Sequence, residues 1–192
     1  MNETVLAGAV CRLRPYRLSD VEPLRANADD PLVSRWMGAE NFPNPYTRDD
    51  ARSWIARALD EPGSQHFAVE VDGAFCGGAG MIAQRGEHRG TAAFGYWLGR
   101  AYWGRGIATD ATRTMARYGL GPGGFRRLEA MVFAPNVASA RVLEKCGFTL
   151  EGRMRDSYVQ RDGAICDGLL YARVAWDPEP SPPAPKLAAP RN

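Results

Sequence analysis

The chain has 192 residues, of which 45% are hydrophobic and 10% aromatic, and this composition is typical of a folded globular protein. Its formal net charge of only +2 indicates no particular class of partner. The sequence has no apolar run of about 18 residues and no signal-peptide pattern near its start, so we expect a cytoplasmic protein without a membrane span.

Composition also divides the chain. Residues 1–176 predict a single domain, whereas 177–192 hold six of the fourteen prolines and predict a disordered tail. The four cysteines lie too far apart for a metal-ligand pair or a redox CxxC motif. We therefore expect buried free thiols rather than disulfides, and no metal.

The first half of the chain predicts one strand, two helices and a hairpin. Residues 9–15 alternate as a strand does, and Ser19 with Glu22 forms a capping-box pattern for a short helix over 18–27. Residues 30–47 predict mostly loop, with a single helical turn as the alternative for part of it. Thr47 then caps a helix that ends at Gly63. Asp72-Gly73 predicts a hairpin turn between strands over 66–71 and 74–83.

The second half adds a third meander strand over 91–99 and, after a Gly-rich loop, a helix that ends near 119–124. A strand over 126–134, a helix over 136–147 and two strands over 149–160 and 164–174 follow. Together the elements predict an α/β (α+β) fold with a mixed, largely antiparallel sheet of about seven strands and one β-α-β unit.

The Gly-rich loop over 102–109, YWGRGIAT, lies between a predicted strand and a predicted helix. The first amides of a helix have no intrahelical partners, and Gly104 and Gly106 allow a ligand to approach the backbone closely. Six arginines and one acid, Asp110, lie between residues 100 and 127. The loop predicts an anion site, with a tight turn beside a solvated arginine face as the alternative.

Two other phosphate-binding motifs can be excluded. A nucleotide P-loop needs GxxxxGK[ST], which the sequence lacks. Gly78 to Ala83 form a loose GxGxxA, but residues 84–86 predict a turn where a dinucleotide-binding fold needs a helix.

Residues 94–111, FGYWLGRAYWGRGIATDA, resemble the acetyl-CoA motif of the GCN5-related N-acetyltransferases (GNAT), and 133–148, FAPNVASARVLEKCGF, resemble that family's next motif. Residues 41–55 and 166–174 suit the subgroup that contains the ribosomal-protein N-terminal (Rim-type) acetyltransferases. The resemblance covers roughly residues 10–175 and implies helices on both faces of the sheet, with strands splayed at a cofactor slot. It also implies an acetyltransferase that uses acetyl-CoA as co-substrate. The excess of Arg over Lys, with many Ala, Gly and Pro, is what a GC-rich bacterial genome would produce, so we expect a bacterial source.

The resemblance implies roles for individual residues. The amides from Gly104 to Thr109 would bind the CoA pyrophosphate, and backbone groups near Trp97 and Leu98 would pair with the pantetheine arm. The cofactor-binding residues so implied are Trp97, Leu98, Trp103, Gly104, Arg105, Gly106, Ile107, Ala108, Thr109, Asn136 and Ser139. Asn136 is also a plain helix cap, and both of its roles can hold together. Ser139 would be the general acid that protonates the leaving thiolate, or simply a first-turn helix residue.

Two positions depart from the family pattern. Leu143 stands where many members have a Tyr general acid, and Ala93 stands where many have a Glu base. The general base is therefore unassigned: it is a water or one of the strand carboxylates, Glu70, Glu129, Glu151, Asp156 and Asp167. His66 and His88 lie at strand or turn positions where a structural role is the more common one.

Residues 32–47 and the final hairpin would form the acceptor groove, with Trp36, Phe42 and Tyr46 as exposed aromatic residues of a binding lip. The alternative for Trp36 is a place over the core. The expected acceptor is a primary amine, either a protein N-terminal α-amine or a small molecule such as a polyamine or an antibiotic. A catalytically silent CoA-binding regulatory domain is a further alternative. We expect no direct nucleic-acid binding, and a monomer or a homodimer.

Overall fold

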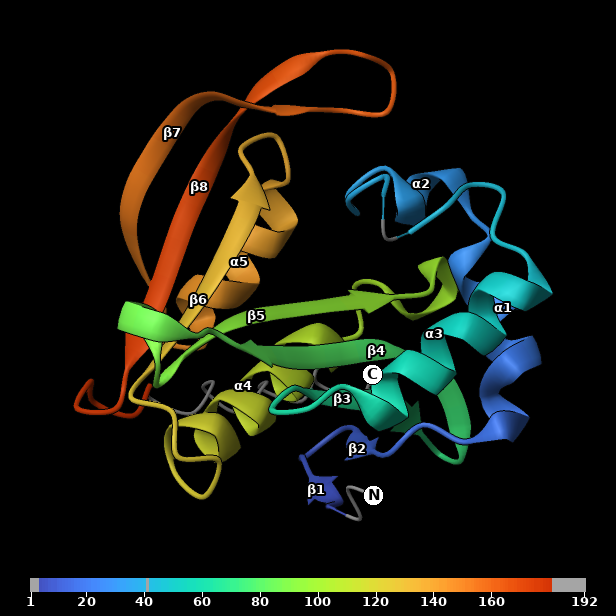
Figure 1. Ribbon diagram of the computed structural model, residues 1–192, viewed down its shortest axis with the longest axis horizontal. Helices are drawn as coiled ribbons and strands as arrows, with labels where there is room; N and C mark the ends of the chain where they lie inside the picture. Colours follow the sequence, from blue (N-terminus) through green and yellow to red (C-terminus); the bar gives the residue numbers. More distant parts are fainter. Residues whose placement is uncertain (1–3, 41, 181–192) are drawn as a thin grey trace, which may run out of the picture.

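An eight-stranded sheet runs through the computed structural model, which describes residues 4–40 and 42–180 (Figure 1). Its spatial order is β1-β2-β3-β4-β5-β6-β8-β7, and every neighbouring pair is antiparallel except β5 and β6. The strands are β1 (Leu6–Ala7), β2 (Arg12–Arg14), β3 (Gln65–Val71), β4 (Ala74–Ala83), β5 (Thr91–Leu98), β6 (Arg127–Phe133), β7 (Thr149–Val159) and β8 (Ile165–Val174).

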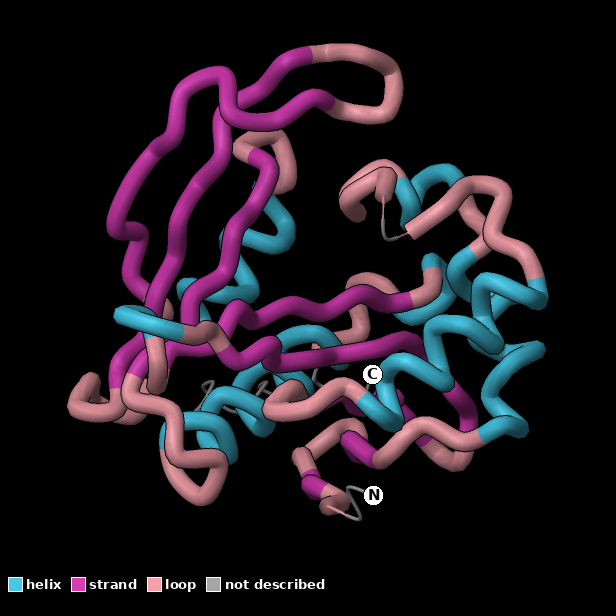
Figure 2. The backbone as a smooth tube through the Cα atoms, viewed as in Figure 1, coloured by secondary structure: helices cyan, strands magenta, loops and turns pink. Residues whose placement is uncertain are grey.

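Helices cover both faces of this sheet (Figures 1 and 2). One buried cluster joins α1 and α3 to β3 and β4, and a second joins α4 and α5 to β4, β5, β6 and β8. The helices are α1 (Val21–Ala28), α2 (Pro31–Ser34), α3 (Arg48–Asp60), α4 (Ile107–Leu120) and α5 (Val137–Lys145), with 3-10 turns at Leu18–Asp20, Gly86–His88 and Arg100–Tyr102. The predicted fold class is confirmed, with the two-residue β1 as the additional strand and β5-α4-β6 as the β-α-β unit.

Two of the predicted local signals are confirmed. Asp72 and Gly73 both have positive φ angles, of 50° and 79°, which is the backbone of a two-residue hairpin turn. The Thr47 side chain accepts a hydrogen bond from the Asp50 amide at the start of α3, and the Asp50 carboxylate bonds back to the Thr47 amide at 2.8 Å.

The predicted cap at Ser19 is wrong. The capping carboxylate is that of Asp20, which accepts the Arg17 amide at 2.8 Å and also binds both terminal nitrogens of Arg14 at 2.8 Å. Arg14 is buried and also donates its Nε to Glu70 at 2.5 Å. The buried Arg14 guanidinium needs the Asp20 carboxylate as its ion-pair partner, and this requirement fixes the place where the helical turn begins.

A second buried carboxylate anchors the start of α4 to the N-terminal hairpin. Asp110 accepts hydrogen bonds from the amides of Ala9, Val10 and Cys11 at 3.0, 2.7 and 3.0 Å. Burial alone would raise the pKa of Asp110, but these three donors outweigh it and hold the pKa below its usual value. The single acid near the Gly-rich loop therefore points away from the loop and into the turn between β1 and β2.

The predicted division of the chain at residue 177 is only partly covered by the structure. Asp177 accepts the Val174 amide at 2.9 Å, and Glu179 pairs with Arg173 at 3.0 Å, so the start of the predicted tail lies against β8. Residues 181–192 lie outside the described residues. The four cysteines are free, three of them buried and Cys166 partly so. Among the described helices, none combines the length and the apolar character that crossing a membrane requires.

Candidate functional site

Strands β5 and β6 separate partway along their length. They pair over only three positions, Thr91 with Arg127, Ala92 with Leu128 and Ala93 with Glu129. Beyond this point β5 continues to pair with β4 as far as Leu98, and β6 with β8 as far as Phe133. Figure 1 shows the two strands diverging, which confirms the predicted splay.

The unpaired edge of β5 presents the backbone of its even-numbered residues. Hydrogen bonds at both ends of β5 show that its odd-numbered residues bond to β4. Tyr96 and Leu98 therefore turn their backbone groups toward the splay, whereas those of Trp97 are used within the sheet. Of the two residues near which we expect ligand-pairing backbone groups, Leu98 thus faces the splay, while Trp97 is bonded within the sheet and its neighbour Tyr96 faces the splay.

Trp103 closes the end of this edge. Its indole Nε1 donates a hydrogen bond to the Leu98 carbonyl at 2.8 Å, while 43% of the residue stays exposed. The Leu98 amide and both backbone groups of Tyr96 are left facing the splay. Trp103 thus holds the junction between β5 and the Gly-rich loop.

The Gly-rich loop ends in the N-terminus of α4. Gly106 is the N-cap residue with φ of 79°, and the first intrahelical bond runs from the Asp110 amide to the Gly106 carbonyl. The amides of Ile107, Ala108 and Thr109 thus have no partner within the helix. A Cβ added at Gly104 or Gly106 would meet no atom within 4 Å, so open space lies over both glycines. The loop fits a bound pyrophosphate, since it offers free amides, a helix N-terminus and room.

The first turn of α5 approaches β5 across the same slot. Asn136 caps α5, its Oδ1 accepting the Ser139 amide at 3.2 Å, as its predicted cap role requires. The Ser139 Oγ lies 3.1 Å from the Tyr96 hydroxyl, which makes a direct contact between α5 and β5. Leu143, at the position of the missing Tyr, is buried in the core and offers no polar group. Sequence reasoning did not find Tyr96, because it lies 43 residues from Ser139.

Two of the three aromatic residues predicted for the acceptor lip do not lie at the surface. Phe42 is 6% exposed and Tyr46 is 4% exposed, and their rings pack together at 5.0 Å. Phe42 also packs edge-on against Trp97 at 5.3 Å, so the irregular segment turns its aromatic side chains inward. The expectation of exposure is wrong for both. Trp36 is partly exposed and contacts Phe133, at the end of β6, at 6.5 Å.

The turn between β7 and β8 reaches across to this irregular segment. Arg161 donates its Nε to the Ser34 carbonyl at 2.7 Å and its Nη2 to the Phe42 carbonyl. Phe133 and Tyr158 pack at 4.5 Å beneath it, which continues the aromatic wall begun by Trp36. We call this connection the arch; it joins the two sides of the expected acceptor groove (Figure 1).

The strand carboxylates differ in their surroundings. Glu70 is buried between Arg14 and Arg12; burial opposes ionisation, but the two guanidinium groups hold its pKa below the usual value. Burial of the Glu151 carboxylate is slight, and Arg127 lowers its pKa. Both are held as ion pairs, which is a structural role.

Glu129 occupies a different place. It is the last β6 residue paired with β5, directly opposite Ala93, and residues in register on parallel strands share a face. That face is the one on which Met131 and Gly95 are exposed. The Glu129 carboxylate accepts Gln84 Nε2 at 2.5 Å and Arg127 Nε at 3.3 Å. A carboxylate thus stands beside the position where the family pattern has one, but on the neighbouring strand.

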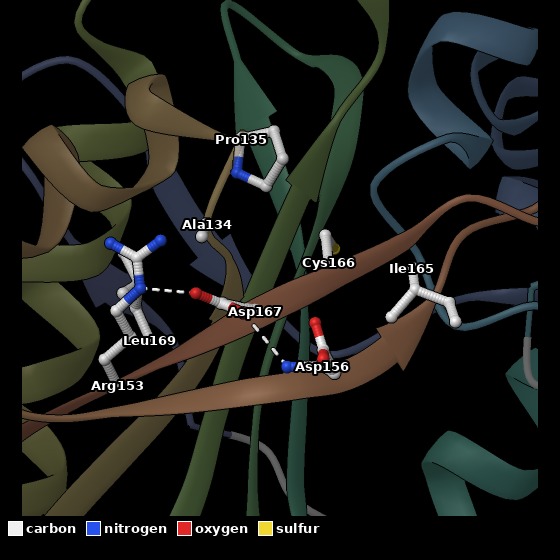
Figure 3. A pocket seen from close by; sticks show the side chains of 8 residues that line it. All are labelled: Ala134, Pro135, Arg153, Asp156, Ile165, Cys166, Asp167 and Leu169. Atoms are coloured by element: carbon white, nitrogen blue, oxygen red, sulfur yellow. Dashed lines mark hydrogen bonds and ion pairs between the residues drawn. The ribbon is translucent and has the colours of Figure 1, made fainter.

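The remaining candidates lie in other surroundings. Asp156 and Asp167 line a hollow of about 460 Å³ between the end of β6 and the β7–β8 hairpin (Figure 3). The Asp156 amide and the Arg153 guanidinium lower the pKa of Asp167. No predicted cofactor-binding residue lines this hollow. His66 is buried, with its Nε2 2.6 Å from Glu61.

Comparison with known proteins gives a consistent result. The model of the acetyltransferase (GNAT) domain family matches residues 11–149. The chain is 45% identical over 181 residues to a probable N-acetyltransferase, YjcK, of Bacillus subtilis, covering 91% of this chain and 99% of that protein. It is 33% identical over 84 residues to the ribosomal-protein-serine acetyltransferase of Escherichia coli, covering 44% of this chain and 46% of that protein.

Among solved structures, the chain resembles Mycobacterium smegmatis RimJ in complex with CoA-disulfide. The TM-score is 0.79 at 26% identity, and the match covers 90% of this chain and 88% of that one. Residues 11–149, which the family model matches, include the splay, the Gly-rich loop and the start of α5.

Proposed function

Since the chain belongs to the acetyltransferase (GNAT) domain family and is an acetyl-CoA-dependent N-acetyltransferase, we propose that its acceptor is the α-amine of a protein N-terminus. The observation that carries this proposal is the arch, through which Arg161 of the β7–β8 turn binds the end of α2 and the segment that follows it. A groove crossed by an arch admits the free end of a chain more readily than a side chain in the middle of a folded surface.

The donor side of the site is the Gly-rich loop together with the open edge of β5. The amides of Ile107, Ala108 and Thr109 would bind the pyrophosphate, and the exposed Arg105 would supply positive charge beside it. The backbone groups of Tyr96 and the backbone amide of Leu98 would hydrogen-bond the pantetheine, because an unpaired strand edge binds an extended amide chain as another strand would. Asn136 would serve as cap and pantetheine contact together.

Acetyl transfer needs a base and an acid. A primary amine is protonated at neutral pH and must lose a proton before it attacks the thioester carbon. We propose that Glu129 is the general base that accepts this proton, directly or through one water. Glu129 lies at the point where β5 and β6 separate and on the exposed face. Ser139 would give its hydroxyl proton to the departing sulfur from the α5 side.

The acceptor side has support from one relative as well as from the arch. The E. coli relative is a ribosomal-protein-serine acetyltransferase, and we propose a protein acceptor for this chain on the same ground. Trp36 and Phe133 would contact the first residues of the acceptor. A cytoplasmic location is part of the proposal, and the four free thiols support it because disulfides are rare in reducing compartments.

The test is thiol release from acetyl-CoA with a panel of amines. The panel contains peptides with free N-termini, the same peptides with blocked N-termini, spermidine and an aminoglycoside. We expect release with free N-terminal peptides above all others. A polyamine or antibiotic as the best acceptor would overturn the protein-acceptor proposal, and CoA binding without turnover on any amine would indicate a regulatory domain.

A further inference from the structure

The Tyr96 hydroxyl is a partly buried polar group to which the acetyltransferase pattern assigns no task. Tyr96 lies on the diverging part of β5, and its hydroxyl is 3.1 Å from the Ser139 Oγ. Within residues 4–40 and 42–180, this hydroxyl is the hydrogen-bond partner that the structure gives to the Ser139 Oγ. The two groups come from opposite walls of the cofactor slot, so their bond spans its inner end.

The direction of this hydrogen bond follows from the chemistry of the two groups. A phenol is a stronger acid than an aliphatic alcohol, so the favoured arrangement has Tyr96 donating and Ser139 accepting. Burial raises the pKa of Tyr96 to about 12, although the bond to Ser139 opposes this rise, and the phenol keeps its proton throughout the neutral range. Because Tyr96 is the donor in this bond, Ser139 has its own proton free to donate elsewhere.

We propose that Tyr96 is a positioning residue that orients the Ser139 hydroxyl toward the sulfur of the acetyl donor. This inference rests on the proposed function, because it takes Ser139 as the proton donor. It explains how the site works with Leu143 where other members have a Tyr: the phenol is supplied from β5 and acts through a serine.

The amine nitrogen forms a bond to the acetyl carbon, the carbon–sulfur bond breaks, and the sulfur keeps the electron pair. Ser139 Oγ transfers its proton to the sulfur and regains one from water, which in turn receives the surplus proton of the acylated nitrogen. Tyr96 keeps its proton and its hydrogen bond throughout.

A double-mutant cycle tests the coupling. Ser139→Ala should lower kcat about 100-fold, as loss of a general acid does, and Tyr96→Phe should lower it about 10-fold, with the KM for acetyl-CoA unchanged in both. The double variant should be no slower than Ser139→Ala, since Tyr96 has no orienting role without that hydroxyl. Tyr171→Phe is the matched control. It removes the hydroxyl of a buried tyrosine of β8 that bonds to Glu144 of α5, the helix that carries Ser139, and it should leave kcat unchanged.

A binding measurement gives a second readout that needs no turnover. At a pH above the ordinary thiol pKa of about 8.5, a serine proton aimed at the sulfur should make wild-type protein prefer CoA over desulfo-CoA. Tyr96→Phe should reduce this preference severalfold and Tyr171→Phe should not. Multiplicative losses of kcat in the cycle, or equal preference in wild type and Tyr96→Phe, would overturn the role of Tyr96. Failure of wild type to bind CoA at all would instead refute the proposed function.

Discussion

Replacing Gly106 by Val tests the anion site at the start of α4. Gly106 has φ of 79°, and a Cβ there would meet no protein atom within 4 Å. In the folded protein, the main effect of the substitution is therefore backbone strain, which for a β-branched residue at positive φ costs about 1–3 kcal/mol. In a domain of this size that lowers Tm by roughly 2–12 °C.

The same substitution should have a much larger effect on the binding of the CoA pyrophosphate. The added side chain fills the space over the free amides, and loss of two charge-assisted hydrogen bonds at about 1.5–3 kcal/mol each weakens CoA binding at least about 100-fold. Gly73→Val is the matched control, because Gly73 has the same φ of 79° and equally empty surroundings in the β3–β4 turn. Calorimetric titration with CoA, alongside Tm, separates strain from site. Equal CoA affinity in folded Gly106→Val and Gly73→Val proteins would refute the assignment of this loop.

Three other substitutions probe the anchor, the arch and the base. Asp110→Asn should lower the free energy of unfolding by about 2–4 kcal/mol at pH 7 in urea titrations. Because the pKa of Asp110 is depressed on folding, this deficit should shrink as pH falls below about 3.9, and a deficit that grew as the pH fell would contradict this. Arg161→Ala should raise the KM for a peptide acceptor about 10-fold and leave the KM for acetyl-CoA unchanged. Arg155→Ala on the same hairpin is the control and should change neither KM. Parallel shifts of both KM values in Arg161→Ala would argue against a role of the arch in acceptor binding. Glu129→Gln should lower kcat about 100-fold and abolish the ascending limb of the pH–rate profile. Glu151→Gln is the control and should leave kcat nearly unchanged. Similar losses of kcat in both variants would point instead to damage to the ion pairs that both carboxylates make with Arg127.

Elements with local causes could be predicted from the sequence. The Asp72-Gly73 turn and the Thr47 cap depend on residues that are neighbours in the chain, and both have the expected geometry. The splay between β5 and β6 was predicted instead from the resemblance of two sequence motifs to those of the GNAT family. No local pattern marks where two paired strands cease to pair.

Contacts between distant residues could not be predicted. The contact of Tyr96 with Ser139 depends on how α5 packs against β5, and the placement of Glu129 opposite Ala93 depends on strand register. The separate motifs contain neither. The acceptor lip was predicted from aromatic residues in an irregular segment. Phe42 is instead buried against Trp97, because an irregular segment can cover a core with its aromatic side chains as a helix does.

The most direct test of the proposed activity is the position of the acetyl group on a peptide with a free N-terminus and an internal lysine. The peptide is incubated with the protein and acetyl-CoA, and tandem mass spectrometry of the product locates the modification. We predict one acetyl group, on the α-amine alone. Acetylation of the lysine side chain, or an unmodified peptide under conditions where the protein binds CoA, would contradict the account.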